Sequence, residues 1–129
     1  MPNISLSARA SFDASTTLYA FQVSGKLAGE DVLMGQPVYI KQSDDKVYKL
    51  AAGQVFVGIA ARNAKAGQPL TVYGPGTRFH ASDTALTANV YYAGAGGVIS
   101  DAATTDDAQG AFIRVSPNDL MVIRAGKLA

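Results

Sequence analysis

The residues best placed to do chemistry surround the single histidine of this 129-residue chain. Ser82 and Asp83 follow His80 closely, and together they supply the residue types of a nucleophile, a base and an orienting carboxylate. Side chains that are neighbours on one strand end and its loop cannot easily align in the order that a catalytic triad requires. We therefore expect a surface or inter-subunit polar role for His80, and we predict no catalytic residue and no enzyme activity.

Two pairs of adjacent carboxylates, Asp44-Asp45 and Asp106-Asp107, could in principle hold a cation. A calcium loop needs several oxygen ligands at set spacing and a bidentate Glu, and neither pair has that surrounding pattern. Both pairs are expected to be solvated loop tips, and the sequence predicts no metal site.

A glycine-rich stretch, Gly94-Ala95-Gly96-Gly97, superficially resembles a loop that cradles phosphate. It lacks the Lys-Ser/Thr that follows in a P-loop, and no helix is expected after it. A hairpin turn that needs positive φ angles explains these glycines fully. No cofactor is predicted.

Composition narrows the class of protein further. The chain is 48% hydrophobic and 16% charged, as in a folded soluble domain, and its net charge is +1. No run of three basic residues occurs, which argues against a nucleic-acid partner. The absence of cysteine excludes disulfides and thiolate metal sites.

The N-terminus lacks the features of a secretion signal, and no stretch approaches the roughly 20 apolar residues of a membrane helix.

One pattern of apolar strands and polar turns occurs twice along the chain. Val38 precedes Gly58 by 20 residues, and Val90 precedes Gly110 by the same number. The tripeptide Gly-Gln-Pro, which opens the first block at residues 35–37, recurs at residues 67–69. Because apolar alternation and turn residues are what recur, the repeat indicates a building unit rather than an active site.

Short apolar runs about 8 to 12 residues apart, separated by turn signals, predict a small all-β fold. We expect a β-barrel or β-sandwich built from hairpins at residues 38–50, 70–81 and 90–100, with the last strands at 111–115 and 120–124. The first strong strand, residues 18–23, is expected to end at Ser24-Gly25-Lys26, and residues 54–60 are predicted to be a buried strand in which Gly58 marks a bulge or a close backbone approach. A mobile polar loop at 101–109 and a loose tail at 125–129 complete the prediction.

Residues 1–17 are predicted to form an extended N-terminal arm or an edge strand, and residues 18–129 a single barrel-like domain. Ile4, Leu6 and Phe12 would gain most by burial against another chain, about 1.5–3 kcal/mol per fully buried side chain. An ordinary edge strand on the chain's own barrel is the alternative, and the sequence leaves both open.

Adjacent aromatic residues suggest a further contact point. Tyr91 and Tyr92 must point to opposite faces if both lie in a strand. We expect one of the two to be exposed, and both are candidates for an interface with another protein or subunit.

From about Leu18 to Arg124, the chain resembles the small capsid decoration, or cement, proteins of tailed double-stranded DNA phages. The resemblance is carried, in order, by Tyr19-Ala20-Phe21-Gln22-Val23, Gly35-Gln36-Pro37-Val38-Tyr39, Phe56-Val57-Gly58-Ile59-Ala60, Ala64-Lys65-Ala66-Gly67-Gln68-Pro69-Leu70-Thr71-Val72 and Asp119-Leu120-Met121-Val122-Ile123. Residues 1–17 match no part of that pattern.

The resemblance implies a structural virion protein that is made in the host cytoplasm and binds the outer capsid surface after head expansion. Its partner would be the major capsid protein, whose joints it would reinforce, and a homo-oligomer is expected, with a trimer favoured. No nucleic-acid or membrane partner is expected. The alternatives are another virion β module (tail, baseplate or head fibre) and a carbohydrate-binding module, which the absence of Trp disfavours.

Overall fold

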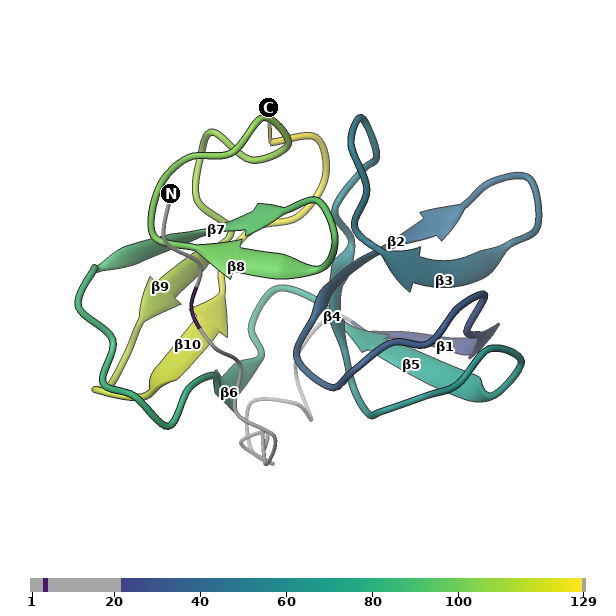
Figure 1. The fold of residues 1–129 in the computed structure, drawn as a ribbon, viewed down its shortest axis with the longest axis horizontal. Coiled ribbons are helices and arrows are strands. Elements are labelled where there is room, and N and C mark those ends of the chain that lie inside the picture. Colours follow the sequence, from purple (N-terminus) through teal and green to yellow (C-terminus); the bar gives the residue numbers. More distant parts are fainter. Residues whose placement is uncertain (1–3, 5–21, 129) are drawn as a thin grey trace.

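A computed structural model describes Ile4 and residues 22–128, which form ten strands and no helix. Five strands make the first sheet, in the order β1-β5-β4-β2-β3: β1 (Gln22–Leu27), β2 (Pro37–Lys41), β3 (Lys46–Lys49), β4 (Gly58–Ala60) and β5 (Pro69–Tyr73). The other five make the second sheet, in the order β6-β10-β9-β7-β8: β6 (Arg78–His80), β7 (Val90–Gly94), β8 (Val98–Ser100), β9 (Phe112–Arg114) and β10 (Asp119–Val122). The two sheets lie side by side (Figure 1).

Both sheets have the same topology. Strands β1 to β5 of the first sheet correspond, in the same spatial order, to strands β6 to β10 of the second sheet. Every pairing between these strands is antiparallel. We call residues 22–73 the first unit and residues 78–122 the second unit. The repeat expected from the sequence corresponds to the β2–β3 hairpin with β4 and to the β7–β8 hairpin with the approach to β9. The prediction of an all-β fold built from hairpins is therefore confirmed.

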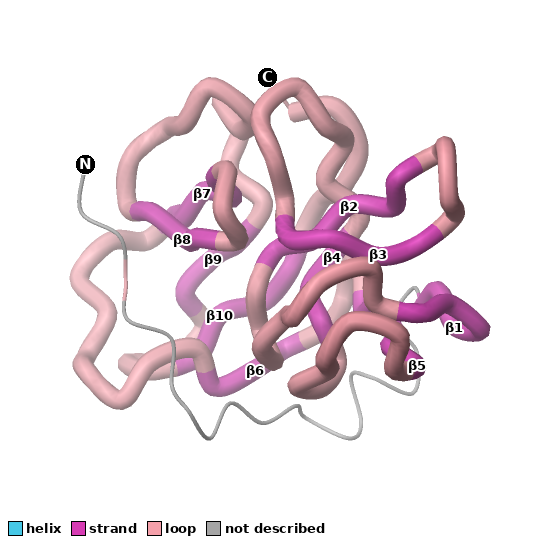
Figure 2. The backbone as a smooth tube through the Cα atoms, turned by 45° about the vertical axis from the view of Figure 1, so that its right-hand side comes forward, coloured by secondary structure: helices cyan, strands magenta, loops and turns pink. Residues whose placement is uncertain are grey.

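The first unit curls until its two outer strands meet. Beyond the end of β1, Ala28 forms a parallel bridge with Val47, and the Gly29 N–H donates to the Val47 carbonyl at 2.8 Å. The curled sheet encloses a small aliphatic core of Ala28, Val32, Val38, Val47, Ala60, Ala64, Leu70 and Val72. Side chains of this size allow the sheet to close tightly. Figure 2 traces the backbone of these strands.

A second, larger core joins the two units. Phe112 lies at its centre, with edge-to-face contacts to Phe56 at 5.7 Å and to Phe79 at 6.0 Å between ring centroids. Phe56 comes from the first unit and the other two rings come from the second, and Leu50 and Ile59 of the first unit belong to the same cluster. Burial of these shared side chains holds the units together.

One predicted hairpin is wrong. Residues 70–73 and 78–80 do not pair with each other, because β5 pairs with β1 and β4 whereas β6 pairs with β10. The Gly-Pro-Gly turn between them carries the chain from one sheet to the other, and the Gly76 N–H donates to the Val122 carbonyl of β10 at 2.8 Å. A turn signal shows where a strand ends but does not show which strand its successor joins.

Ser24-Gly25-Lys26, predicted to end the first strand, lies inside β1. Gly25 has φ 79°, and the pairing of β1 with β5 shifts register between Val23 and Lys26. Glycine here permits a β-bulge, which bends the strand without ending it. Residues 18–21 lie outside the described residues.

The loose tail predicted for residues 125–129 is also wrong over its described part. The Gly126 N–H donates to the Phe56 carbonyl at 2.7 Å, and the Ala108 N–H donates to the Leu128 carbonyl at 2.9 Å. Leu128 is buried in the shared core. The predicted strand at 54–60 is shorter than expected, since β4 covers only Gly58–Ala60 and Phe56 pairs with the C-terminal segment instead.

Candidate functional site

The two Gly-Gln-Pro tripeptides fold into the same turn. In the first, the Gln36 N–H donates to the Leu33 carbonyl at 3.2 Å, and the Gln36 side-chain oxygen accepts the Leu33 N–H at 2.9 Å. In the second, Gln68 makes both bonds with Lys65, each at 2.9 Å. The glycines of the two turns have φ angles of 86° and 89°, which only glycine adopts readily. Each turn is therefore rigid, and each leads directly into a strand.

The segments that precede these turns lie antiparallel to each other. Val32 and Ala64 exchange two backbone hydrogen bonds, of 2.8 and 2.9 Å, and both side chains are buried in the first unit's core. This pairing fixes the distance between the two turns.

Two polar side chains, one from each segment, strengthen this pairing in the same way. Asp31 accepts the Ala66 N–H of the opposite segment at 3.0 Å, and Asn63 accepts the Met34 N–H at 2.7 Å. Asp31 and Asn63 each stand four residues before the glycine of their own turn. The two segments thus form a locally symmetric pair, and the side-chain oxygens are used to position backbone.

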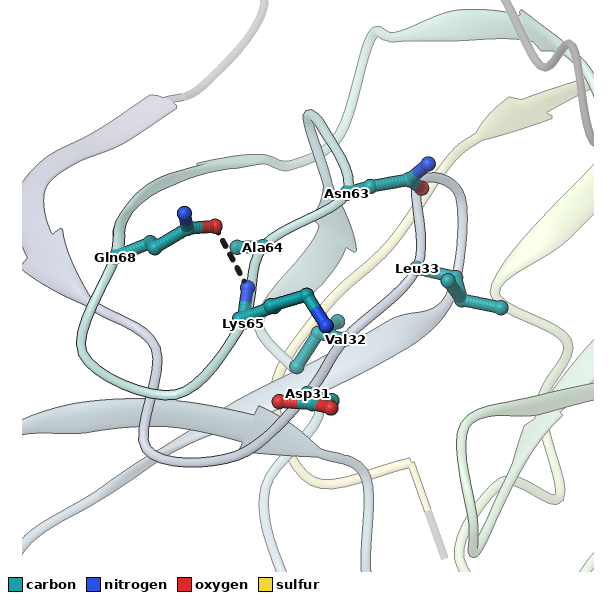
Figure 3. A pocket seen from close by; sticks show the side chains of 7 residues that line it. All are labelled: Asp31, Val32, Leu33, Asn63, Ala64, Lys65 and Gln68. Carbon is teal, nitrogen blue, oxygen red and sulfur yellow. Dashed lines mark hydrogen bonds between the residues drawn. The ribbon is translucent and has the colours of Figure 1, made fainter.

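A hollow of about 340 Å³, which we call the first pocket, lies between the paired segments. Figure 3 shows the lining residues, which both segments supply: Asp31, Val32, Leu33, Asn63, Ala64, Lys65 and Gln68. Leu33 is 59% exposed, the most of any large apolar side chain among the described residues, and Lys65 is exposed as well. The first pocket thus combines an exposed apolar group with the Lys65 cation and the Asp31 carboxylate on a frame of paired segments, which suits binding to another molecule.

None of the residues of the first pocket was among the site residues predicted from the sequence. The repeated tripeptide was visible in the sequence, and the Asp or Asn four residues before each glycine was a second signal that could have been read with it. The pairing of two segments 32 residues apart was not visible, because it depends on the curl of the whole sheet.

His80 belongs to a polar cluster at the paired strands β6 and β10. Its Nε2 lies 2.9 Å from Asp83 Oδ1, and its Nδ1 lies 3.4 Å from Asp119 Oδ1. Asp119 also pairs with Arg78 at 2.9 Å. Ser82 is buried, and its hydroxyl oxygen accepts the Thr84 N–H at 3.2 Å. Both ring nitrogens of the histidine thus face carboxylates, an arrangement that holds the strands together rather than activating a nucleophile.

The cluster predicts a pH dependence of stability. The hydrogen bond to Asp83, and then that to Asp119, raise the pKa of His80 above its ordinary value. Because the folded pKa exceeds the unfolded one, the histidine contributes its full stability below the unfolded pKa and loses it as pH rises through the folded pKa. We expect the urea midpoint of the wild type to decrease as the pH is raised from about 5.5 to about 8.5. The decrease should be smaller in His80→Gln. Equal pH profiles for the two proteins would contradict this assignment.

The adjacent tyrosines lie on opposite faces of β7, as predicted. Tyr92 is half-buried, and its role in an interface stays a prediction. Tyr91 is only 1% exposed, and its hydroxyl oxygen accepts the N–H groups of Thr87 and Ala88 at 3.1 Å each. The prediction of an interface role for Tyr91 is therefore corrected, because its ring lies in the shared core and its hydroxyl holds the loop before β7.

Of the arm residues predicted to contact another chain, only Ile4 is described. Its N–H donates to the Ile99 carbonyl of β8 at 2.9 Å, and its half-buried side chain packs against the shared core. This contact fits the alternative in which the arm lies on the chain's own sheet, and a contact of Ile4 with a partner stays a prediction. Leu6 and Phe12 lie outside the described residues.

The two carboxylate pairs differ from each other. Asp44 and Asp45 are exposed at the β2–β3 tip, as expected, and Asp45 pairs with Lys26 at 2.6 Å. Asp106 and Asp107 are buried, which corrects the prediction that they form a solvated tip. The Asp107 carboxylate accepts four backbone N–H groups and so organises the loop predicted to be mobile.

No group of three or more His, Cys, Asp or Glu residues that could hold a metal ion occurs in the described part of the chain. Within that part, no helix is long and apolar enough to cross a membrane. No protein-family model matches this sequence, and no curated protein matches it significantly.

Proposed function

We propose that this chain is a structural virion protein that binds the outer surface of a phage capsid and stabilises the joints between major capsid protein subunits. The observation that carries the proposal is the highly exposed Leu33 at the rim of the first pocket. Two turns with the same pattern of hydrogen bonds belong to the segments that line this pocket. A protein that reinforces a shell needs rigid apolar contact points of this kind.

The segments that resemble decoration proteins support the proposal by their positions. They contribute β2, β4 and β5 of the first sheet and β10 of the second, and they include both Gly-Gln-Pro turns and Lys65 of the first pocket. The resemblance therefore covers the frame of the candidate binding surface as well as the strands behind it.

The free energy gained by burying exposed apolar side chains also favours this function. Full burial of one leucine side chain contributes about 1.5–3 kcal/mol. A pre-formed turn loses little conformational entropy on binding, so most of that free energy remains available for association. Many copies on one shell stabilise the assembled state by mass action, so each copy needs only modest affinity. We further propose a homo-oligomer, with a trimer favoured.

Cosedimentation tests the proposal. Purified protein is mixed with expanded capsids and, separately, with unexpanded precursor shells of the phage. We expect the protein to pellet with expanded shells only, since expansion creates the mature joints. Light scattering of the free protein separates a monomer from a trimer. Protein that pellets with neither expanded nor unexpanded shells would reject the proposed function.

A further inference from the structure

In each unit, the second strand of the hairpin has one carbonyl that accepts an N–H from outside the hairpin. In β3 this carbonyl belongs to Val47, which accepts the Gly29 N–H at 2.8 Å. In β8 it belongs to Ile99, which accepts the Ile4 N–H at 2.9 Å. Val47 and Ile99 are both fully buried, and they are 52 residues apart, which is also the distance from residue 38 to residue 90 in the sequence repeat. The two carbonyls therefore occupy corresponding places.

The donor to this carbonyl comes from different parts of the chain in the two units. In the first unit, Gly29 is the second residue after β1, so the sheet closes on itself. The corresponding residue after β6 is Ser82, but its N–H donates to the Asn118 carbonyl at 3.4 Å instead. The donor to Ile99 is Ile4, which lies 18 residues before the start of β1. The second unit is therefore closed by a residue from outside it.

The contact of Ile4 with the second unit also involves its side chain. In the first unit the contact is made by backbone, since a Cβ at Gly29 would overlap the ring of Tyr48. In the second unit the Ile4 side chain is half-buried and packs against the shared core, to which Ile99 also belongs. A main-chain hydrogen bond combined with a packed apolar side chain is how an extended peptide binds the edge of a sheet.

We propose that the outer edge of β8 is a docking site for an extended peptide with an apolar residue, and that its occupant is the chain's own N-terminal segment around Ile4. A strand edge presents N–H and C=O groups that another segment can pair with. The docking depends on the contacts at β8 rather than on the connection through residues 5–21, so a free peptide of the same sequence binds the site as well. The site works in this way whether or not the chain binds a capsid.

Peptide titrations test the docking on the full chain. Ile4→Pro removes the N–H that the Ile99 carbonyl accepts, and it lies outside the ten strands, so the variant should fold with the β8 edge open. A peptide of residues 1–10 is added to the isotope-labelled variant, and the amide NMR signals of Val98, Ile99 and Ser100 are followed. We expect the wild-type peptide to return these signals toward their wild-type positions. An Ile4→Ala peptide should bind about 10-fold more weakly, because it keeps the N–H but loses most of the apolar contact. An Ile4→Pro peptide should not bind.

Two further measurements use the wild-type chain. Its site is already occupied, so it should need at least about 10-fold more peptide than Ile4→Pro does. The Ile4 amide hydrogen should exchange with solvent at least about 10-fold more slowly in the folded chain than in the free peptide, a measurement that needs no variant to fold. The docking site would be overturned by equal responses of wild type and Ile4→Pro, by equal binding of the three peptides, or by an unprotected Ile4 amide.

Discussion

Replacing Asp107 by alanine is expected to lower the free energy of unfolding by about 4 kcal/mol. The Asp107 side chain is fully buried, and its carboxylate accepts four backbone N–H groups at 2.8–3.1 Å, from Ala93, Gln109, Gly110 and Ala111. Alanine leaves these donors unpaired in the interior, and each unpaired buried donor costs about 1–3 kcal/mol. These bonds join β7 to the segment that leads into β9, so we expect the second unit to lose its order first.

Urea unfolding measures the loss, and the neighbouring residue supplies a matched control. Asp106 is also buried, but one of its oxygens accepts only the Gly53 N–H and the other has no partner. Asp106→Ala should therefore change stability by about 1 kcal/mol or less. Asp107→Asn should fall between the two, because its amide retains one accepting oxygen. Similar losses in the two alanine variants would contradict the role assigned to Asp107.

Replacing Gly58 by alanine is expected to cost about 3 kcal/mol, the second large effect. A Cβ at this position would overlap the carbonyl oxygen of Tyr73, which is backbone and cannot rotate away. The neighbouring Ile59 pairs with Tyr73 across β4 and β5, so relief of the overlap would separate two central strands. The close backbone approach predicted for this glycine is confirmed.

Gly53→Ala is the control for backbone conformation. Gly53 has φ 79°, and a Cβ there would meet no atom within 4 Å. Its substitution should cost only the strain of the left-handed conformation, about 1–2 kcal/mol. Comparison of the urea midpoints of the two variants isolates the steric part of the Gly58 effect. Equal midpoints would show that the strands separate easily and that the close approach is unimportant.

The strands and local hairpins could be predicted from the sequence because they depend on neighbours in the chain. Alternating apolar residues and a polar tip define β2–β3, with Tyr39 opposite Tyr48, and a glycine-rich tip defines β7–β8. The duplication was visible as well, since both units repeat the same spacing. None of this needed knowledge of distant contacts.

Errors arose where a residue's environment comes from far along the chain. Asp107 was predicted to be a solvated loop residue, but its carboxylate accepts the N–H of Ala93, 14 residues away, as well as three nearer N–H groups. Tyr91 was predicted to be a surface candidate, but it lies in the shared core. The C-terminal residues looked like a tail, but they pair with Phe56. Short polar or mixed segments carry no local sign of such partners.

The sequence by itself determined the all-β class, the β2–β3 and β7–β8 hairpins, the repeated unit and the positions that require glycine, because backbone sterics and apolar alternation act over a few residues. Only the tertiary structure decided that β5 and β6 belong to different sheets, that Asp107 is buried, and that segments far apart in sequence pair to form the first pocket. These features follow from the curl and packing of whole sheets, in which contacts between distant residues compete with one another.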